Sequence, residues 1–233
     1  MATLNPAIPA GRRGGGDGSG GSSAIDYRGR LRRARLGLAI AVAPIIMLFV
    51  SFTSAYVVRQ GLPTFDEHSG KYVRDWLTVS LPSALLLANT LVLVVSSTTM
   101  ELARRQTARH VALAPVSSVP GVSIGKERMF PWLAVTATLG LAFLAGQWMA
   151  WDVLAKRGFY VATSPSSSFV YLLTAAHAVH LGGGLLALFY ALVITRANRP
   201  AEARYIVIDT AAWYWHFMAV LWIYIFALLW VAK

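Results

Sequence analysis

The stretch from Ser168 to Arg196 constrains the fold of this chain more than any other. It reads SFVYLLTAAHAVHLGGGLLALFYALVITR, and it contains no charged residue between Phe169 and Ile194. At about 1.5 Å per residue, a helix of this length crosses the roughly 30 Å hydrocarbon core of a bilayer. The stretch therefore predicts a membrane-spanning helix.

Polar and small residues give this predicted helix two distinct features. His177 and His180 lie near its midpoint, and their i, i+3 spacing places both on one face. Glycines follow directly, within two stripes of small residues at four-residue steps: Thr174–Ala178–Gly182 and Gly183–Ala187–Ala191. Such stripes let helices approach closely in lipid. We therefore predict that this helix packs inside a bundle, with its polar face inward.

Four further apolar runs predict four more spans. The chain is 56% hydrophobic and 13% charged, with a mean hydropathy of +0.55, whereas a soluble domain carries about 25% charge. The sequence thus predicts an all-α integral membrane protein with five transmembrane helices in residues 31–233. Residues 1–30 are rich in Gly, Ser and Arg and predict a disordered tail. The predicted spans are 36–58, 76–100, 130–153, 169–194 and 211–231.

The distribution of charge predicts an orientation. With the N-terminus inside, 15 of the 21 basic residues fall in inner segments, so the positive-inside rule places the N-terminus in the cytoplasm and the C-terminus outside. The net charge of +11 then reflects cytoplasmic loops, not nucleic-acid binding. The chain has no cysteine, which excludes disulfides and thiol chemistry.

Three histidines fall inside predicted spans: His177, His180 and His216. Buried imidazoles can ligate haem or a metal ion. However, histidines at i, i+3 on one helix cannot ligate one haem iron from opposite faces, and no acidic residue is near in sequence to complete a metal site. We interpret all three as hydrogen-bonded packing groups and expect no cofactor, metal or catalytic residue. A haem-binding membrane cytochrome is the alternative.

The other polar residues of the spans favour helix packing over transport. Glu101 and Asp152 lie at span ends, and Asp75 and Asp209 lie at span ends or in loops, where water should keep them ionised. A small transporter needs charge at mid-membrane, and no internal repeat is evident. We interpret the uncharged polar residues as interhelical hydrogen-bonding groups: Asn89, Thr90, Ser96, Ser97 and Gln147.

Five motifs, one in each span, resemble subunit III of the haem–copper cytochrome oxidases. In chain order, they are FTSAYVVR (52–59); Trp76 with Leu81-Pro82, Asn89-Thr90 and Ser96-Ser97; Gly140, Phe143, Gln147 and Trp151; YLLTAAHAVHLGGG (171–184); and YWHF (214–217) with Trp222. Each motif alone is weak, but five in order, at this spacing, identify the chain as a member of that family, in a five-span bacterial form.

The resemblance implies both a fold and a role. It implies a helical bundle lacking the first two helices of seven-helix members, in a bacterial inner membrane. Such a subunit is non-catalytic, packs on subunit I in a complex that includes subunit II, holds phospholipid in a cleft, and supports stability and proton uptake. Haem and copper belong to the partner subunits. The resemblance suggests as lipid or interhelical contacts Arg59, Asn89, Gln147, His177, His180 and His216, and the glycine run suggests as helix-packing residues Gly182, Gly183 and Gly184.

Three departures weaken a proton-relay role. Family members often have a carboxylate where this chain has Ile45, Val-Asp where it has Met218-Ala219, and Glu a few residues after Gln147. These losses leave the packing role untouched. They also keep open an alternative, the subunit III-like accessory protein of a nitric oxide reductase or quinol oxidase.

Overall fold

The computed structural model describes residues 19–66, 70–73, 76, 81–117, 131–197 and 200–231. Within these residues, five helices are long and apolar enough to cross a membrane, which confirms the predicted all-α class. The helices are α1 (Ser19–Gly61), α2 (Ser83–Ser117), α3 (Trp132–Lys156), α4 (Pro165–Arg196) and α5 (Ala201–Val231). Between α1 and α2, strands β1 (Thr64–Asp66) and β2 (Lys71–Val73) pair antiparallel in a short hairpin, which the sequence did not predict.

The first helix is longer than the predicted span. It begins at Ser19, so residues 19–30, assigned to the disordered tail, are helical; residues 1–18 lie outside the described residues. The added turns include Arg28 and Arg30, and arginine is a good helix former. They also find a partner, because the Tyr27 ring lies 6.4 Å from the Tyr205 ring of α5.

The second helix is displaced from its predicted span. It begins at Ser83, not at Trp76, because Pro82 disfavours helical backbone at the preceding residue. Trp76 lies outside the helix and packs with Tyr56 and Phe169, at ring distances of 5.1 and 6.5 Å. The helix then continues past the predicted end at residue 100 to Ser117, since no glycine or proline interrupts residues 83–114.

The charged segment before the last predicted span is helical too. We predicted a loop over residues 196–210, but α5 begins at Ala201, directly after Pro200. Proline is favoured at a helix start because its fixed φ suits the helix and its missing N–H is not needed there. Arg204 N donates to Pro200 O at 3.2 Å, which closes the first turn.

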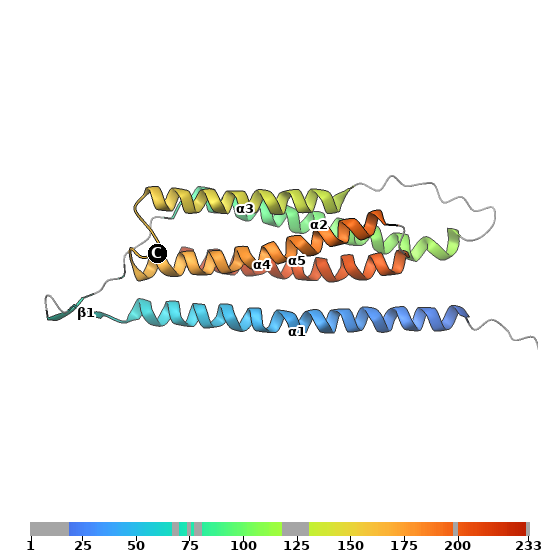
Figure 1. Ribbon diagram of the computed structural model, residues 1–233, viewed down its shortest axis with the longest axis horizontal. Helices are drawn as coiled ribbons and strands as arrows, with labels where there is room; N and C mark the ends of the chain where they lie inside the picture. The colour runs from blue at the N-terminus through green and yellow to red at the C-terminus, as the bar shows by residue number, and fades with distance from the viewer. Residues whose placement is uncertain are drawn as a thin grey trace, which may run out of the picture.

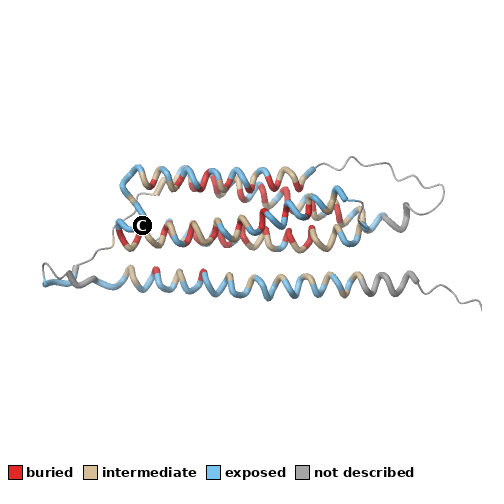
Figure 2. The backbone as a smooth tube through the Cα atoms, in the orientation of Figure 1, coloured by how far each residue is buried: buried red, intermediate tan, exposed pale blue. Residues whose placement is uncertain are grey.

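Helices α2 to α5 form the packed bundle, and α1 lies along one side of it (Figure 1). Helix α5 packs against α1, α2 and α4, whereas α1 touches only α4 and α5 among the described helices. Burial follows this arrangement: only 6% of the most apolar segment of α1 is buried, against 44% for α3 (Figure 2). The first helix is therefore a peripheral element held by few contacts.

A ladder of hydrogen bonds joins α2 to α5. Trp222 Nε1 donates to Thr90 Oγ1 at 3.0 Å, and Trp215 Nε1 donates to Ser96 Oγ at 3.1 Å. Ser96 Oγ in turn donates to Thr136 O of α3. Polar side chains that bridge helices satisfy each other where lipid offers no partner.

Candidate functional site

A group of charged side chains gathers at the end of the bundle where α1 begins, and we call it the ionic cluster: Arg35, Glu101, Arg104, Arg105 and Asp209. Asp209 of α5 is 0% exposed. Its carboxylate accepts from Arg35 Nε at 2.9 Å, from Arg35 Nη2 at 3.1 Å and from Arg104 Nη1 at 3.2 Å. A buried carboxylate is costly unless it is paired and hydrogen-bonded, and here arginines from α1 and α2 both compensate it.

Glu101 connects the ionic cluster along α2. Its carboxylate accepts from Arg104 Nε and from Arg105 Nε, both at 2.7 Å. Arg104 therefore bridges two carboxylates, one on its own helix and one on α5. A continuous chain of ion pairs thus runs from Glu101 through Arg104 and Asp209 to Arg35, and it ties three helices together.

His216 extends this polar chain into the interface between α2 and α5. Its Nδ1 lies 2.6 Å from Ser97 Oγ, and its Nε2 lies 3.5 Å from Glu101 Oε2. The structure thus brings this predicted site residue into an interhelical contact that includes an acid of the ionic cluster.

The burial of Asp209 is a correction. We predicted that this acid lies in a loop or at a span end where water keeps it ionised, but it is helical and fully buried. The sequence held two signals for the cluster. Glu101 precedes Arg104 and Arg105 at i, i+3 and i, i+4, and Asp209 precedes His216 by two turns on the same face.

A groove runs between α1 and α5 next to the ionic cluster. The two helices are parallel, joined at one end by Arg35 and Asp209 and near the other by Tyr224, whose hydroxyl donates to Thr53 Oγ1 at 3.0 Å. The groove has a volume of about 560 Å³, in the range of small-molecule sites. Matching i, i+3, i+4, i+7 stripes line it: Arg35, Leu38, Ala39 and Val42 on α1, and Trp213, His216, Phe217 and Val220 on α5.

His177 and His180 share a helix but contact different neighbours. His177 is 0% exposed, and its ring lies between Phe143 and Trp222, at 5.9 and 5.1 Å. Neither of its ring nitrogens has a hydrogen-bond partner among the described residues, so it is not the hydrogen-bonded group that we expected. His180 instead packs on Phe49 of α1, and its Nδ1 lies 2.7 Å from Ala176 O.

The remaining predicted polar residues are far from the ionic cluster. Asn89 is buried, and its Nδ2 donates to Phe143 O of α3 at 3.4 Å. Gln147 is buried as well, and its Oε1 has no partner among the described residues. Arg59, in the last turn of α1, donates from Nη1 to Leu62 O at 3.1 Å.

The three predicted packing glycines of α4 differ in their surroundings. A methyl group at Gly184 would lie 2.9 Å from Tyr214 Cε1, so this glycine does allow close approach of α5. At Gly182 and Gly183 a methyl group would meet no atom within 4 Å. Among the described residues, no helix therefore packs closely against α4 at these two glycines. The tightest glycine contacts are on α3, where a methyl at Gly146 would overlap Asn89 Oδ1, and one at Gly140 would lie 2.7 Å from Leu185 Cδ1.

The chemistry of the described residues is that of packing and charge compensation. Across the described ranges, no three His, Asp or Glu side chains lie close enough together to hold a metal ion. Ile45, at the position where we noted a missing carboxylate, is partly buried against the core, and Met218 and Ala219 are buried. These features define a five-helix membrane protein whose helices are joined by buried polar contacts.

The particular family follows from comparison with known proteins. The family model for cytochrome c oxidase subunit III matches residues 30–232, and the chain belongs to that family. The chain is 25% identical over 219 residues to a protein of Nocardia farcinica named probable cytochrome c oxidase subunit 3, covering 94% of this chain and 98% of that one. It is also 30% identical over 144 residues to the Mycobacterium leprae protein of that name, covering 62% and 64% of the two chains.

A third relative extends the comparison beyond these two bacteria. The cytochrome c oxidase subunit 3 of Synechocystis is 26% identical over 188 residues, covering 79% of this chain and 69% of that one. Family membership makes the chain a membrane subunit of a multi-subunit haem–copper oxidase, as the sequence motifs predicted.

Proposed function

We propose that this chain is the non-catalytic subunit III of a proton-pumping terminal oxidase in a bacterial inner membrane. It packs on subunit I, in a complex with subunit II, and supports the stability and proton uptake of the catalytic subunit. Its N-terminus faces the cytoplasm and its C-terminus faces outside. Haem and copper belong to the partner subunits, and this chain binds neither.

The surroundings of the buried acid Asp209 support this proposal. Asp209 is compensated by Arg35 and Arg104 from two other helices. A carboxylate that accepts hydrogen bonds from arginines of two other helices connects those helices, and we assign it that structural role. The absence of an acid at Ile45 points the same way. We therefore expect the subunit to act on proton uptake through the structure of its partner.

Comparison of the oxidase purified with and without this chain tests the proposal. We expect equal haem and copper per subunit I in both preparations, together with faster loss of activity over successive turnovers in the preparation without it. Loss of a haem along with this chain would contradict the proposal and favour a membrane cytochrome. The isolated chain should likewise show no Soret absorbance, and a band that disappears in a His216→Ala variant would count against us.

We further propose that the groove between α1 and α5 holds an acyl chain of a structural phospholipid. Its lining is apolar apart from Arg35 and His216 at its polar end. Arg35 uses Nε and Nη2 on Asp209 and retains further N–H groups, because a guanidinium has five. An apolar channel that ends at an arginine suits a lipid tail beneath an anionic head.

Filling the groove tests this lipid site. Ala39→Phe places an aromatic ring in the lining, and we expect the purified complex to lose about one phospholipid per copy of this chain. Gly37→Ala is the matched control, since a methyl there meets no atom within 4 Å. An unchanged phospholipid count in Ala39→Phe would contradict the lipid site but not the role as subunit III.

A further inference from the structure

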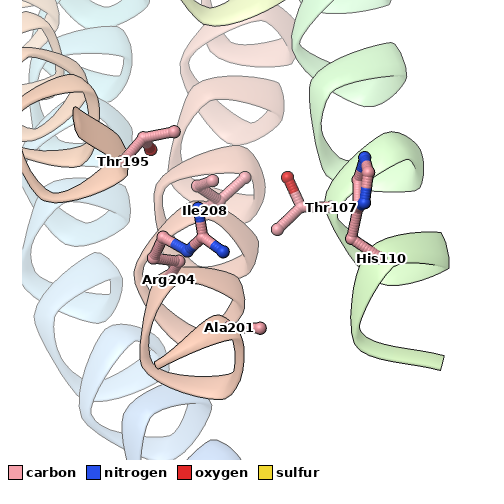
Figure 3. A pocket seen from close by; sticks show the side chains of 6 residues that line it. All are labelled: Thr107, His110, Thr195, Ala201, Arg204 and Ile208. Atoms are coloured by element: carbon pink, nitrogen blue, oxygen red, sulfur yellow. The ribbon is translucent and has the colours of Figure 1, made fainter. Parts of the chain in front are cut away.

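A second, smaller pocket lies between α2, α4 and α5, at the same end of the bundle as the ionic cluster (Figure 3). Its volume is about 40 Å³. Figure 3 shows Arg204 of α5 and Thr107 of α2 on facing sides of the pocket, with His110 further along α2. The lining residues are Thr107, His110, Thr195, Ala201, Arg204 and Ile208.

Two nitrogen atoms of the lining are buried without a hydrogen-bond partner among the described residues. They are Nε of Arg204 and Nε2 of His110. The Thr107 and Thr195 hydroxyls donate to Ala103 O and Ala191 O of their own helices, and neither hydroxyl oxygen lies within hydrogen-bond reach of these two nitrogens. A buried donor that is left unsatisfied costs free energy. The pocket thus has one certain donor without an acceptor, the Arg204 Nε–H, beside a ring nitrogen of His110 that donates in one of its tautomers.

The electrostatics of the pocket favour an anion as that acceptor. The lining contains Arg204 and no acidic residue. Glu202 is exposed, and its i, i+2 spacing from Arg204 directs it to another side of α5. Asp209 is occupied by Arg35 and Arg104. Ala201 brings the first turn of α5 to the pocket, where the helix dipole adds positive potential.

Size and depth narrow the choice of anion. The volume has room for about three water molecules at roughly 10–15 Å³ each, so an oxyanion group fits and a nucleoside or an acyl chain does not. Thr195 directly follows Ile194, the end of the predicted apolar span of α4. The pocket therefore lies where the hydrocarbon ends and lipid headgroups begin.

We infer that this pocket binds a phosphate group through Arg204 and His110. The phosphate comes either from the headgroup of an anionic phospholipid or from free phosphate. A guanidinium suits this ligand because its planar fork of donors matches phosphate oxygens. The inference stands apart from the lipid groove, which lies between α1 and α5 and shares no lining residue with this pocket.

The test uses the delipidated oxidase complex and counts bound ligand by native mass spectrometry. Phosphatidylglycerol is compared with diacylglycerol, which lacks the phosphate, and inorganic phosphate is added as a separate arm. We expect the wild type to bind one more phosphatidylglycerol per copy of this chain than Arg204→Gln does, with an affinity about ten- to a hundredfold higher at that site. Arg109→Gln, which removes an exposed arginine on α2 next to His110, should bind like the wild type.

Two further variants protect the test against a folding defect. Arg204→Lys keeps the charge but loses the fork, and Ala201→Leu keeps every charge but fills the pocket; both should lose the extra ligand while the complex stays intact. Competition by millimolar phosphate would assign the site to the free anion, and none would assign it to the lipid. Equal binding in wild type and Arg204→Gln, or equal binding of diacylglycerol, would overturn the inference and leave a pocket that holds water or a partner's side chain.

Discussion

Asp209 of α5 accepts two hydrogen bonds from Arg35 of α1, a residue 174 positions earlier in the chain. This pair joins the first helix to the last. Because α1 has little buried surface of its own, this pair is an important part of its attachment to α5. The ionic cluster is therefore the first place to perturb.

Removing both arginines should destabilise the chain more than removing either one. Arg35→Gln leaves Asp209 with Arg104, and Arg35 is 44% exposed, so we expect a loss of about 1 kcal/mol in unfolding free energy, discounted for solvent screening. The double variant Arg35→Gln/Arg104→Gln leaves a buried carboxylate unpaired, and a loss of about 3–5 kcal/mol is expected. Denaturant unfolding of the detergent-solubilised chain measures both.

The pair of Lys156 and Asp152 provides the control for that experiment. It is an i, i+4 ion pair at the surface, with exposed fractions of 74% and 52%. Lys156→Gln should change the unfolding free energy by less than about 0.5 kcal/mol. A loss in the double variant as small as in this control would show that the ionic cluster does not hold α1.

A hydrophobic carbodiimide should leave the spans of the wild-type chain unlabelled. The reagent reacts with protonated carboxylic acids in apolar sites, and both carboxylate oxygens of Asp209 are engaged by Arg35 or Arg104. In the Arg35→Gln/Arg104→Gln variant the buried Asp209 loses both arginine partners, and we expect an adduct to form there. Mass spectrometry of the treated complex locates the adducts, and labelling of Asp209 in the wild type would contradict the assigned role of the arginines.

An engineered acid tests the position of the missing carboxylate. Ile45 is partly buried against the core, so Ile45→Glu should place a protonated acid in an apolar site and create a new carbodiimide adduct there. Exposed Val50→Glu on the same helix is the comparison. If Ile45→Glu remains unreactive in a folded complex, its side chain does not face the apolar interior.

Gly146→Ala should destabilise the contact between α2 and α3. Its added methyl would overlap Asn89 Oδ1 and lie 2.8 Å from Asn89 Cγ, and such overpacking costs about 1–3 kcal/mol. Asn89→Ala removes the clashing atoms, so the double variant should recover part of the loss. Gly182→Ala, where a methyl meets no atom within 4 Å, should be close to neutral. Equal unfolding free energies for Gly146→Ala and Gly182→Ala would contradict the tight contact.

The Gly183→Leu variant tests whether this face of α4 packs on a partner subunit. The glycine is exposed, and nothing lies within 4 Å of an added methyl, so the isolated chain should insert and fold normally. We expect the variant to copurify poorly with the oxidase, because the bulky side chain keeps a partner helix away from this stripe. Copurification at normal yield would show that this face of α4 meets lipid.

The number and type of helices could be predicted from the sequence, because apolar runs long enough to span a membrane have few alternatives. Helix ends could not. α2 continues beyond residue 100, and α5 begins at Ala201, through charged residues that looked like loops. The charged residues are compensated there, because Glu101 pairs with Arg104 and Arg105 one turn along its own helix and Asp209 pairs with arginines of two other helices. A hydropathy profile shows only that charge is present.

The surroundings of the predicted site residues could also be predicted only in part from the sequence. The motifs placed Asn89, Gln147 and His216 inside spans, but sequence spacing does not give the rotation of a helix about its axis relative to its neighbours. For this reason Gly184 faces α5 whereas Gly182 and Gly183 do not, and His177 and His180 meet different rings. The contact between Arg35 and Asp209 has no local signal, since it depends on how α1 and α5 lie together.

The contact between Arg35 of α1 and Asp209 of α5 also determines when α1 can dock during synthesis of the chain. At roughly 5–20 residues per second, about 10–35 s of translation separate Arg35 from the acid that receives it. During this interval α1 lies in the bilayer without Asp209, and we expect water and lipid headgroups at the interface to solvate Arg35. A chain released before Asp209 is synthesised cannot form the ion pair that holds α1. Docking of α1 through this pair therefore follows the synthesis of α5, and a chain that stops before Asp209 lacks the ion pair between the two helices.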